Sequence, residues 1–395
     1  MSKLLYTQTT MPSTFLDTLG VTPAEPRAIT PSEPATVVGP AAGLRRPRNP
    51  GGGIAFDEQV PADGYLWWYV DAMSDDGQHA LTLIAFVGSV FSPYYAHARR
   101  KALRSDNASV TRGANPEEFC AINAALYRGV DTAGTRERNG YWWAMTEHSR
   151  HSVVRDADSM RVGKSAFLSC DDTLIIELNE ITVPFPRRVR GRIYVELAQQ
   201  CDESYPLAQQ GGHLWRPIAP SAKIRVELTD PPMRWEGRAY VDSNRGDAPL
   251  ESAFRDWTWT RTHEVREDGT LDEATRVFYE VMTNTGECRQ ISASFSHQAL
   301  GGANATSIVS SSTPVPTSQA LDQTLWGITR SLPCDPERDC RVLKTAESAP
   351  FYARSIIETT LGGRIHRGMH ESLSMARFEK RWVQCLLPFK MPRVR

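Results

Sequence analysis

Short runs of alternating apolar and polar residues follow one another along most of this chain, and no long helical pattern separates them. They occupy residues 65–91, 141–148, 165–169, 173–178, 191–198, 223–229, 276–283 and 289–297. Alternation with a period of two places the apolar side chains on one face of an extended chain. Strands at this spacing, without interleaved helices, predict antiparallel barrels or sandwiches. We therefore expect a mainly β fold.

The domain organisation is predicted from length and from one proline-rich region. A chain of 395 residues can form two domains with substantial cores. Residues 1–55 contain many prolines and no apolar period, so we expect a disordered leader there. We expect a first antiparallel β-domain in residues 56–222 and a second in residues 223–395.

Local signals predict turns and breaks between these strands. Residues 74–77 (Ser-Asp-Asp-Gly) and the pair Gly362-Gly363 are typical of hairpin turns. Residues 244–247 (Asn-Arg-Gly-Asp) also indicate a turn. Residues 91–100 break the strand pattern. Residues 120–129 fit a helix or a strand, and we favour the strand.

The composition excludes several classes of protein. A formal net charge of −1 argues against a nucleic-acid partner, which would need a basic excess. Seven irregularly spaced cysteines without a Cys-x-x-Cys pair predict reduced thiols in a cytoplasmic protein, and we assign no metal. The longest mostly apolar run, residues 80–91, is shorter than the roughly 20 residues that span a bilayer, and no secretory signal is present.

One stretch, residues 234–260, combines aromatic residues with a carboxylate. In an extended chain Tyr240 and Asp242 share one face, because side chains two residues apart point the same way. His213 and Trp215 have the same spacing. An acid, an imidazole and two large rings suit proton chemistry on an apolar substrate. The alternatives are structural: Asp242 would cap a turn, His213 would be a hydrogen-bonded half-buried histidine, and the two rings would be core residues.

Tryptophan is the one unusual count in the composition. The ten tryptophans include close pairs, namely Trp67 with Trp68, Trp142 with Trp143, and Trp257 with Trp259. Clustered tryptophans are most often core residues or the lining of a barrel. They also suit a large hydrophobic ligand.

Several longer strings point to a known family. They are WWYVDAMSDDG (67–77), FVGSVFSPYYAHARR (86–100), WAMTE (143–147), HLWRPIAP (213–220), YVDSNRGDAPLE (240–251), FRDWTW (254–259), PFYARS (350–355) and HESLSMARF (370–378). In collinear order, over roughly residues 56–391, the chain resembles the carotenoid 1,2-hydratases, also called hydroxyneurosporene synthases. The leader lies outside this resemblance.

The resemblance implies a fold of two lipocalin-like β-domains and a cofactor-free reaction. In that reaction water adds to the 1,2 double bond of an acyclic carotenoid such as neurosporene or lycopene, pigments of photosynthetic bacteria. The product is a 1-hydroxy carotenoid. Matched motif by motif, the family's functional residues fall on His213, Trp215, Tyr240 and Asp242, with Asp242 as the proton donor.

The chemistry of such a hydration sets requirements for the site. Protonation at C2 needs an acid, yet an Asp with a pKa of about 3.9 is protonated only about once in a thousand molecules at pH 7. Burial raises a carboxyl pKa by up to about 3–5 units, so we predict a desolvated Asp242. The base for the attacking water is His213 or the deprotonated Asp242, and the sequence does not separate them.

Aromatic rings are the second requirement, because a ring face attracts a cation and is a weak nucleophile. We assign contacts with the carotenoid and its cation to aromatic side chains near the acid in sequence or on the first predicted strand. They are Trp67, Tyr69, Trp257 and Trp259, beside Tyr240 and Trp215.

The C-terminal segment is the expected route to a membrane-dissolved substrate. Met375, Phe378 and Trp382 recur at helical spacing, and Pro388 is expected to end this short helix. Its basic residues, together with Phe378, Trp382, Leu386 and Phe389, suit peripheral contact with an anionic membrane, such as the intracytoplasmic one. The alternative is a helix packed on the second β-domain with a solvated basic face.

Two other functions fit the same β-domains and aromatic lining. One is a non-catalytic carotenoid or isoprenoid carrier, which has no need of a desolvated acid. The other is a related cofactor-free cyclase, which would reshape a polyene without adding water.

Overall fold

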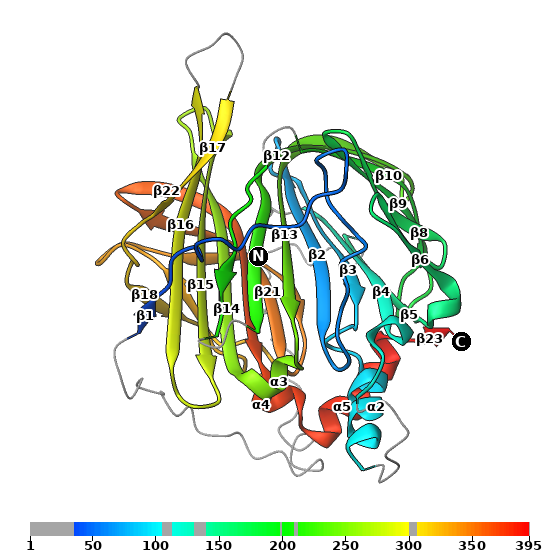
Figure 1. Ribbon diagram of the computed structural model, residues 1–395. Coiled ribbons are helices and arrows are strands. Elements are labelled where there is room, and N and C mark those ends of the chain that lie inside the picture. The colour runs from blue at the N-terminus through cyan, green and yellow to red at the C-terminus, as the bar shows by residue number, and fades with distance from the viewer. Residues whose placement is uncertain are drawn as a thin grey trace, which may run out of the picture.

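Two large curved sheets dominate the computed structural model, which describes residues 35–104, 113–129, 140–197, 200–208, 212–299 and 306–394 (Figure 1). The mainly β fold expected from the alternating runs is therefore confirmed. No helix in these ranges is long and apolar enough to cross a membrane.

The first sheet curls into a half-barrel (Figure 1). In order of pairing, its strands are β23 (Arg393–Val394), β5 (Tyr141–His148), β4 (Cys120–Arg128), β3 (His79–Val87), β2 (Tyr65–Ser74), β13 (Met233–Gly246), β12 (His213–Asp230), β10 (Arg188–Glu196), β9 (Thr173–Ile181), β8 (Ser165–Cys170), β7 (Ser159–Val162) and β6 (Val153–Arg155), with β11 (Tyr205–Pro206) beside β12. Neighbouring strands are antiparallel except for the parallel pair β23–β5.

The second sheet packs against one face of the first (Figure 1). Its strands, in order, are β1 (Thr36–Val37), β16 (Cys288–Ala299), β15 (Leu271–Thr283), β14 (Phe254–Val265), β22 (Arg364–Ser374), β21 (Tyr352–Leu361) and β20 (Arg341–Ser348), with β17 (Thr306–Ser312) beside β16. A separate small sheet pairs β18 (Ser318–Leu321) with β19 (Arg330–Pro333).

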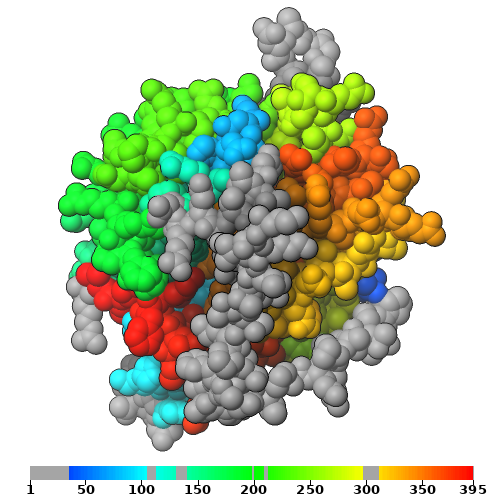
Figure 2. Space-filling view, turned by 180° about the vertical axis from the view of Figure 1, so that it is seen from behind, coloured from blue at the N-terminus to red at the C-terminus, as the bar shows by residue number. Residues whose placement is uncertain are grey.

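Short helices lie at the ends of the strands. They are α2 (Pro93–Leu103), α3 (Leu250–Ala253), α4 (Met375–Phe378) and α5 (Arg381–Lys390), with 3-10 turns at Pro116–Glu118 and Arg150–Ser152. α5 and α2 lie side by side at one end of the molecule, where Figure 2 shows the C-terminal segment in red beside α2 in cyan. The short C-terminal helix expected from the sequence is present as α4 and α5.

The first sheet is buried on both of its faces near β2. Trp67 and Tyr69 point into the inter-sheet core, which contains residues of both sheets. Trp68 and Val70 point into the half-barrel core, formed inside the curl of the first sheet. Because side chains alternate along a strand, the adjacent Trp67 and Trp68 belong to different cores.

Several local expectations are confirmed. The hairpin at residues 74–77 joins β2 to β3, and the hairpin at Gly362-Gly363 joins β21 to β22. Residues 120–128 form β4, the strand that we favoured.

Two local expectations are wrong, and a third is confirmed as a helix. Residues 244–246 are not a turn but the end of β13, because β12 and β2 pair with them on both sides. The break in the strand pattern expected at residues 91–100 is confirmed, because residues 93–103 form α2. Its start is marked by Pro93 and by the Ser92 hydroxyl, which accepts a hydrogen bond from the Tyr95 amide at 3.0 Å. Pro388 lies inside α5, near its end, where it interrupts little of the helix.

The structure also bears on the expected leader and on the expected boundary between the two domains. Residues 1–34 of the expected leader lie outside the described residues, whereas β1 pairs with β16, and Arg46 forms an ion pair with Asp202 at 3.8 Å. Residues 36, 37 and 46, which were expected to be disordered, therefore make contacts with the folded chain. The expected boundary between residues 222 and 223 lies inside β12, and the chain passes from the first sheet to the second at α3.

Candidate active site

Asp242 lies within β13 and faces the inter-sheet core, with only 3% of its surface exposed. Its Oδ2 accepts hydrogen bonds from Trp215 Nε1 and from the Tyr240 hydroxyl, both at 2.8 Å. Its Oδ1 is buried without a hydrogen-bond partner in the described part of the chain. The carboxyl group is thus oriented through one oxygen and has the other available for a ligand.

Burial raises the pKa of Asp242 to about 8. The two donors, Trp215 and Tyr240, oppose this shift, because hydrogen bonds to the charged form favour it. Negative charges on Glu371 and Asp71 reinforce it. The desolvation predicted for this acid is confirmed, and at neutral pH most molecules hold it in the protonated form.

His213 occupies a separate position from the acid. Its Nδ1 lies 2.9 Å from the Tyr65 hydroxyl, its ring centroid lies 4.9 Å from that of Phe254, and burial lowers its pKa to about 4. In the strand register His213 lies opposite Gly246, four residues from Asp242, or about 13 Å along the strand. The structure therefore does not bring the predicted histidine to the carboxyl group.

Gly246 fixes this histidine in place. A Cβ at this position would lie 2.2 Å from Tyr65 Cε1 and 2.6 Å from His213 Nδ1. Only glycine leaves room for the two rings to meet over the strand. The glycine that suggested a turn in the sequence is thus required for close packing.

The four aromatic residues predicted to contact substrate converge on Asp242. Trp67, Tyr69, Trp257 and Trp259 line one cavity with Asp242, together with Asn244, Tyr279 and Glu371. The rings come from both sheets: the Trp67 and Trp257 centroids are 6.0 Å apart, and those of Tyr69 and Trp259 are 5.3 Å apart. We call this space the acid cavity.

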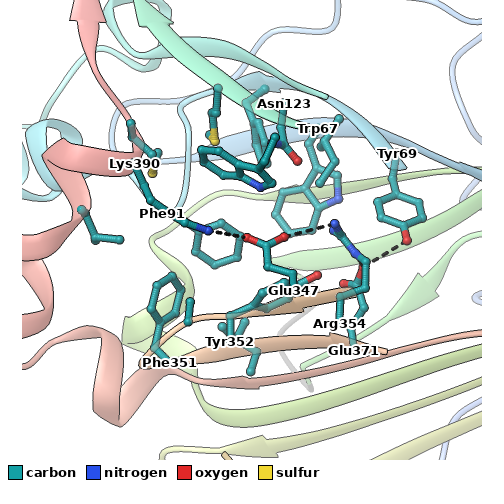
Figure 3. Close-up of a pocket in the computed structure, with 18 of the residues that line it drawn as sticks. Trp67, Tyr69, Phe91, Asn123, Glu347, Phe351, Tyr352, Arg354, Glu371 and Lys390 are labelled. Carbon is teal, nitrogen blue, oxygen red and sulfur yellow. Dashed lines mark hydrogen bonds and ion pairs between the residues drawn. The ribbon is translucent and has the colours of Figure 1, made fainter. Parts of the chain in front are cut away.

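A larger, mostly apolar cavity adjoins the acid cavity and shares four of its lining residues, Trp67, Tyr69, Trp257 and Glu371 (Figure 3). The space between its atoms, including its opening, is about 760 Å³. Leu387 and Lys390 of α5, and Met391 after it, line the far part. We call this space the entry cavity, because it extends from the C-terminal helix toward Asp242.

A chain of charged groups crosses one wall of the entry cavity (Figure 3). Lys390 Nζ lies 3.6 Å from Glu347, Arg354 Nη1 lies 3.3 Å from Glu347, and Arg354 Nε lies 2.9 Å from Glu371. The Tyr69 hydroxyl donates to Glu371 Oε1 at 3.0 Å. This chain links the second sheet to α5 and to the first sheet.

Sequence reasoning missed these charged groups as site residues, although a signal was available. Arg354 and Glu371 lie opposite each other in the hairpin of β21 and β22. Counting outward from Gly362-Gly363 would have paired them, because residues equally distant from a tight turn face each other.

Asp71 is a second buried carboxyl group, on β2 next to β13. It forms an ion pair with Arg261 of β14 and accepts a hydrogen bond from the Tyr69 hydroxyl at 3.2 Å. Both members of the ion pair are fully buried.

Comparison with known proteins gives one consistent family. The family model described as carotenoid hydratase CrtC matches residues 83–395. A Thiocapsa roseopersicina protein named acyclic carotenoid 1,2-hydratase is 40% identical over 346 residues, which is 88% of this chain and 77% of that protein. A protein of the same name from Rubrivivax gelatinosus is 41% identical over 343 residues, 87% of this chain and 76% of that protein. One from Cereibacter sphaeroides is 31% identical over 312 residues, 79% and 98% of the two chains.

Proposed function

The chain belongs to the carotenoid hydratase CrtC family, and we propose that it adds water to the 1,2 double bond of an acyclic carotenoid, with Asp242 as the proton donor. The observation that carries this proposal is a buried carboxyl group, protonated at neutral pH, in a cavity lined by rings. The product is a tertiary 1-hydroxy carotenoid.

In the first step the proton of Asp242 moves to C2 of the alkene, and a tertiary cation forms at C1. A solvated aspartic acid would first need about 4 kcal/mol to become protonated at pH 7. The pKa of about 8 removes that requirement. The bare Oδ1 is the oxygen that would deliver the proton, because Trp215 and Tyr240 hold Oδ2.

The cation at C1 would lie among the rings of the acid cavity. Trp67, Trp257 and Trp259 present π faces from both sheets. Each cation–π contact contributes about 0.5–2 kcal/mol. None of these rings competes with water as a nucleophile.

Trp215, Tyr240 and His213 support this chemistry in different ways. Trp215 and Tyr240 orient the acid directly. We assign His213 a positioning role, since it holds the Tyr65 ring, which stacks on Trp67 at a centroid distance of 4.9 Å. Its distance from Asp242 makes it a poor base for the attacking water.

We also propose that α5 contacts an anionic membrane peripherally. Trp382, Leu386 and Phe389 are exposed and share one face of the helix, because they lie four and then three residues apart. Trp326 stacks on Trp382 at 6.3 Å and extends this apolar face. The basic residues near it are Arg377, Lys380 and Arg381. An amphipathic basic helix of this kind suits an anionic bilayer surface.

Co-sedimentation with vesicles containing anionic lipid tests the membrane contact. The double variant Leu386→Asp/Phe389→Asp should bind at least tenfold more weakly, since each apolar side chain contributes about 1.5–3 kcal/mol when buried. Ile365→Asp is the matched control, because Ile365 is 52% exposed and lies at the opposite end of β22 from α4. Equal binding by all three proteins would contradict the proposal.

Product mass tests the proposed reaction. Purified protein is incubated with lycopene in liposomes, and the pigments are analysed by mass spectrometry. Gain of one water supports the hydratase. An isomer of unchanged mass would indicate a cyclase instead, and bound but unaltered lycopene would indicate a carrier.

A further inference from the structure

Hydration requires an acceptor for a proton as well as a donor, and this inference rests on the proposed function. When water adds to C1, its oxygen forms the new C–O bond and must lose one proton. His213 is bonded to Tyr65 outside both cavities. Asp242 is a carboxylate once it has released its proton at C2, and it is one candidate for this acceptor. The other carboxyl group that lines the acid cavity is Glu371.

Glu371 reaches the acid cavity from the opposite sheet. It lies on β22 beside Trp259 of β14, whereas Asp242 lies on β13 beside Tyr69 of β2. The Tyr69 hydroxyl donates to Glu371 Oε1 at 3.0 Å, so one side chain connects the neighbourhoods of the two carboxyl groups. Asp242 and Glu371 therefore flank the same space.

The environment of Glu371 differs from that of Asp242 in one decisive way. Arg354 Nε donates to Glu371 Oε1 at 2.9 Å, and its positive charge balances a carboxylate there. Both hydrogen bonds to Glu371 in the described residues end at Oε1. Oε2 is therefore the oxygen that can take a hydrogen bond from water.

We propose that Glu371 is the base that accepts the proton of the attacking water. The C1–O bond forms from an oxygen lone pair of water as the O–H bond breaks, and the proton moves to Glu371 Oε2. Asp242 is then a carboxylate and Glu371 a carboxylic acid. Return of one proton from Glu371 to Asp242 through the shared cavity restores both groups, and the net reaction is alkene plus water to alcohol.

With this assignment, the addition of water at C1 depends on Glu371 and the proton transfer at C2 depends on Asp242. Exchange of the product hydroxyl with water tests the step at C1 alone. In H2¹⁸O, Glu371 takes a proton from solvent and gives it to the product hydroxyl, which leaves as water. Labelled water then adds to the cation at C1 and returns one proton to Glu371. That exchange needs no removal of the C2 proton by Asp242. The unmodified protein and Asp242→Asn should therefore both exchange ¹⁸O into the product.

The test compares Asp242→Asn with Glu371→Gln in two assays, hydration of lycopene and ¹⁸O exchange into its 1-hydroxy product. Both variants should hydrate at least 100-fold more slowly, the usual contribution of a general acid or base. Only Glu371→Gln should also lose exchange at least 100-fold. Glu371→Asp, which retains a carboxylate, should restore part of both activities, and this result would exclude simple misfolding.

Three results would overturn the assignment. They are exchange by Glu371→Gln at the rate of Asp242→Asn, absence of exchange in Asp242→Asn, and hydration by Glu371→Gln within threefold of the unmodified protein. Failure of the unmodified protein to hydrate lycopene would instead refute the proposed function, and the role of Glu371 with it.

Discussion

The tripeptide Tyr-Val-Asp occurs twice in the centre of the first sheet, at residues 69–71 and 240–242. The two copies lie side by side on antiparallel strands, where Tyr240 faces Asp71, and Asp242 faces Tyr69. Both carboxyl groups are buried, and each lies within hydrogen-bond distance of the hydroxyl of the tyrosine two residues before it, although Tyr69 shares its hydrogen between Asp71 and Glu371. Locally the two copies are equivalent.

The difference between the copies comes from the residues that face them. Arg261 of the second sheet reaches Asp71 with a full positive charge. Asp242 meets the neutral donor Trp215 instead. Burial raises the pKa of both carboxyl groups, but only at Asp71 does an opposite charge oppose the shift. The same three residues thus give a structural ion pair in one copy and a neutral acid in the other.

The largest expected effect is on activity in the second copy. Asp242→Asn should lower the rate of lycopene hydration about 10²–10⁴-fold, because no other group is placed to protonate C2. At about pH 4 its free energy of unfolding should match that of the unmodified protein, since asparagine resembles the protonated acid. At pH 7 it should be about 4 kcal/mol higher, because only the unmodified chain gains free energy by ionising this group when it unfolds. Product mass spectrometry and urea unfolding measure the two quantities. A large loss of stability without loss of hydration would reverse the assignment.

In the first copy, substitution of Asp71 should affect stability more than activity. Asp71→Asn leaves the Arg261 guanidinium buried without its counter-charge and should lower the free energy of unfolding by about 3–5 kcal/mol. Adding Arg261→Met should recover part of this loss, because the unpaired charge is removed. Urea unfolding of both variants checks the prediction. Equal stability of the single and double variants would show that the ion pair does not govern this copy.

The pH dependence of stability distinguishes the copies further. With a folded pKa of about 8, Asp242 keeps a proton that the unfolded chain releases near pH 4. The folded state binds more protons in this window, so stability falls as pH rises, by about 1.4 kcal/mol per unit from this group. The difference in unfolding free energy between the unmodified protein and Asp242→Asn should carry this slope. A difference in unfolding free energy that stays constant between pH 5 and pH 8 would contradict this prediction.

The smallest expected effect is on the pH dependence of hydration, through the neutral hydrogen-bond donor Trp215. Trp215→Phe removes one of the two hydrogen bonds that favour the carboxylate and should raise the pKa of Asp242 further. The alkaline limit of hydration should move up by about one pH unit, within the usual strength of a hydrogen bond to a charged group. Trp235→Phe is the matched control, because that indole lies on β13, the strand of Asp242, and its Nε1 has no hydrogen-bond partner in the described chain. Identical pH profiles for the two variants would disprove the role of Trp215.

Sequence patterns predicted those features that depend on neighbours along the chain. Alternation predicted the strands, and two-residue spacing put Tyr240 and Asp242 on one face, as the structure has them. The Asp-Gly signal in residues 74–77 and the pair Gly362-Gly363 predicted hairpins. These signals are local, because side-chain alternation and turn geometry involve only a few residues.

The remaining features depend on pairing between distant segments. Residues 244–246 have turn-forming identities, yet two partner strands keep them extended. The distance of His213 from Asp242 follows from the register of β12 against β13, which pairs His213 with Gly246 and Pro217 with Asp242. The encounter of Asp71 with Arg261 requires the packing of one sheet on another. No pattern within either segment contains that information.

The two faces of α5 have a consequence for delivery of the pigment. Leu387 and Lys390 line the entry cavity, while Leu386 and Phe389 face outward from the same turns of helix. Transfer of a long polyene from lipid through water would be opposed by about 0.8 kcal/mol for every methylene-sized group exposed. If α5 contacts lipid as we propose, the end of the polyene would pass directly from the apolar bilayer to the apolar cavity. Extraction from the bilayer would then proceed without an aqueous intermediate.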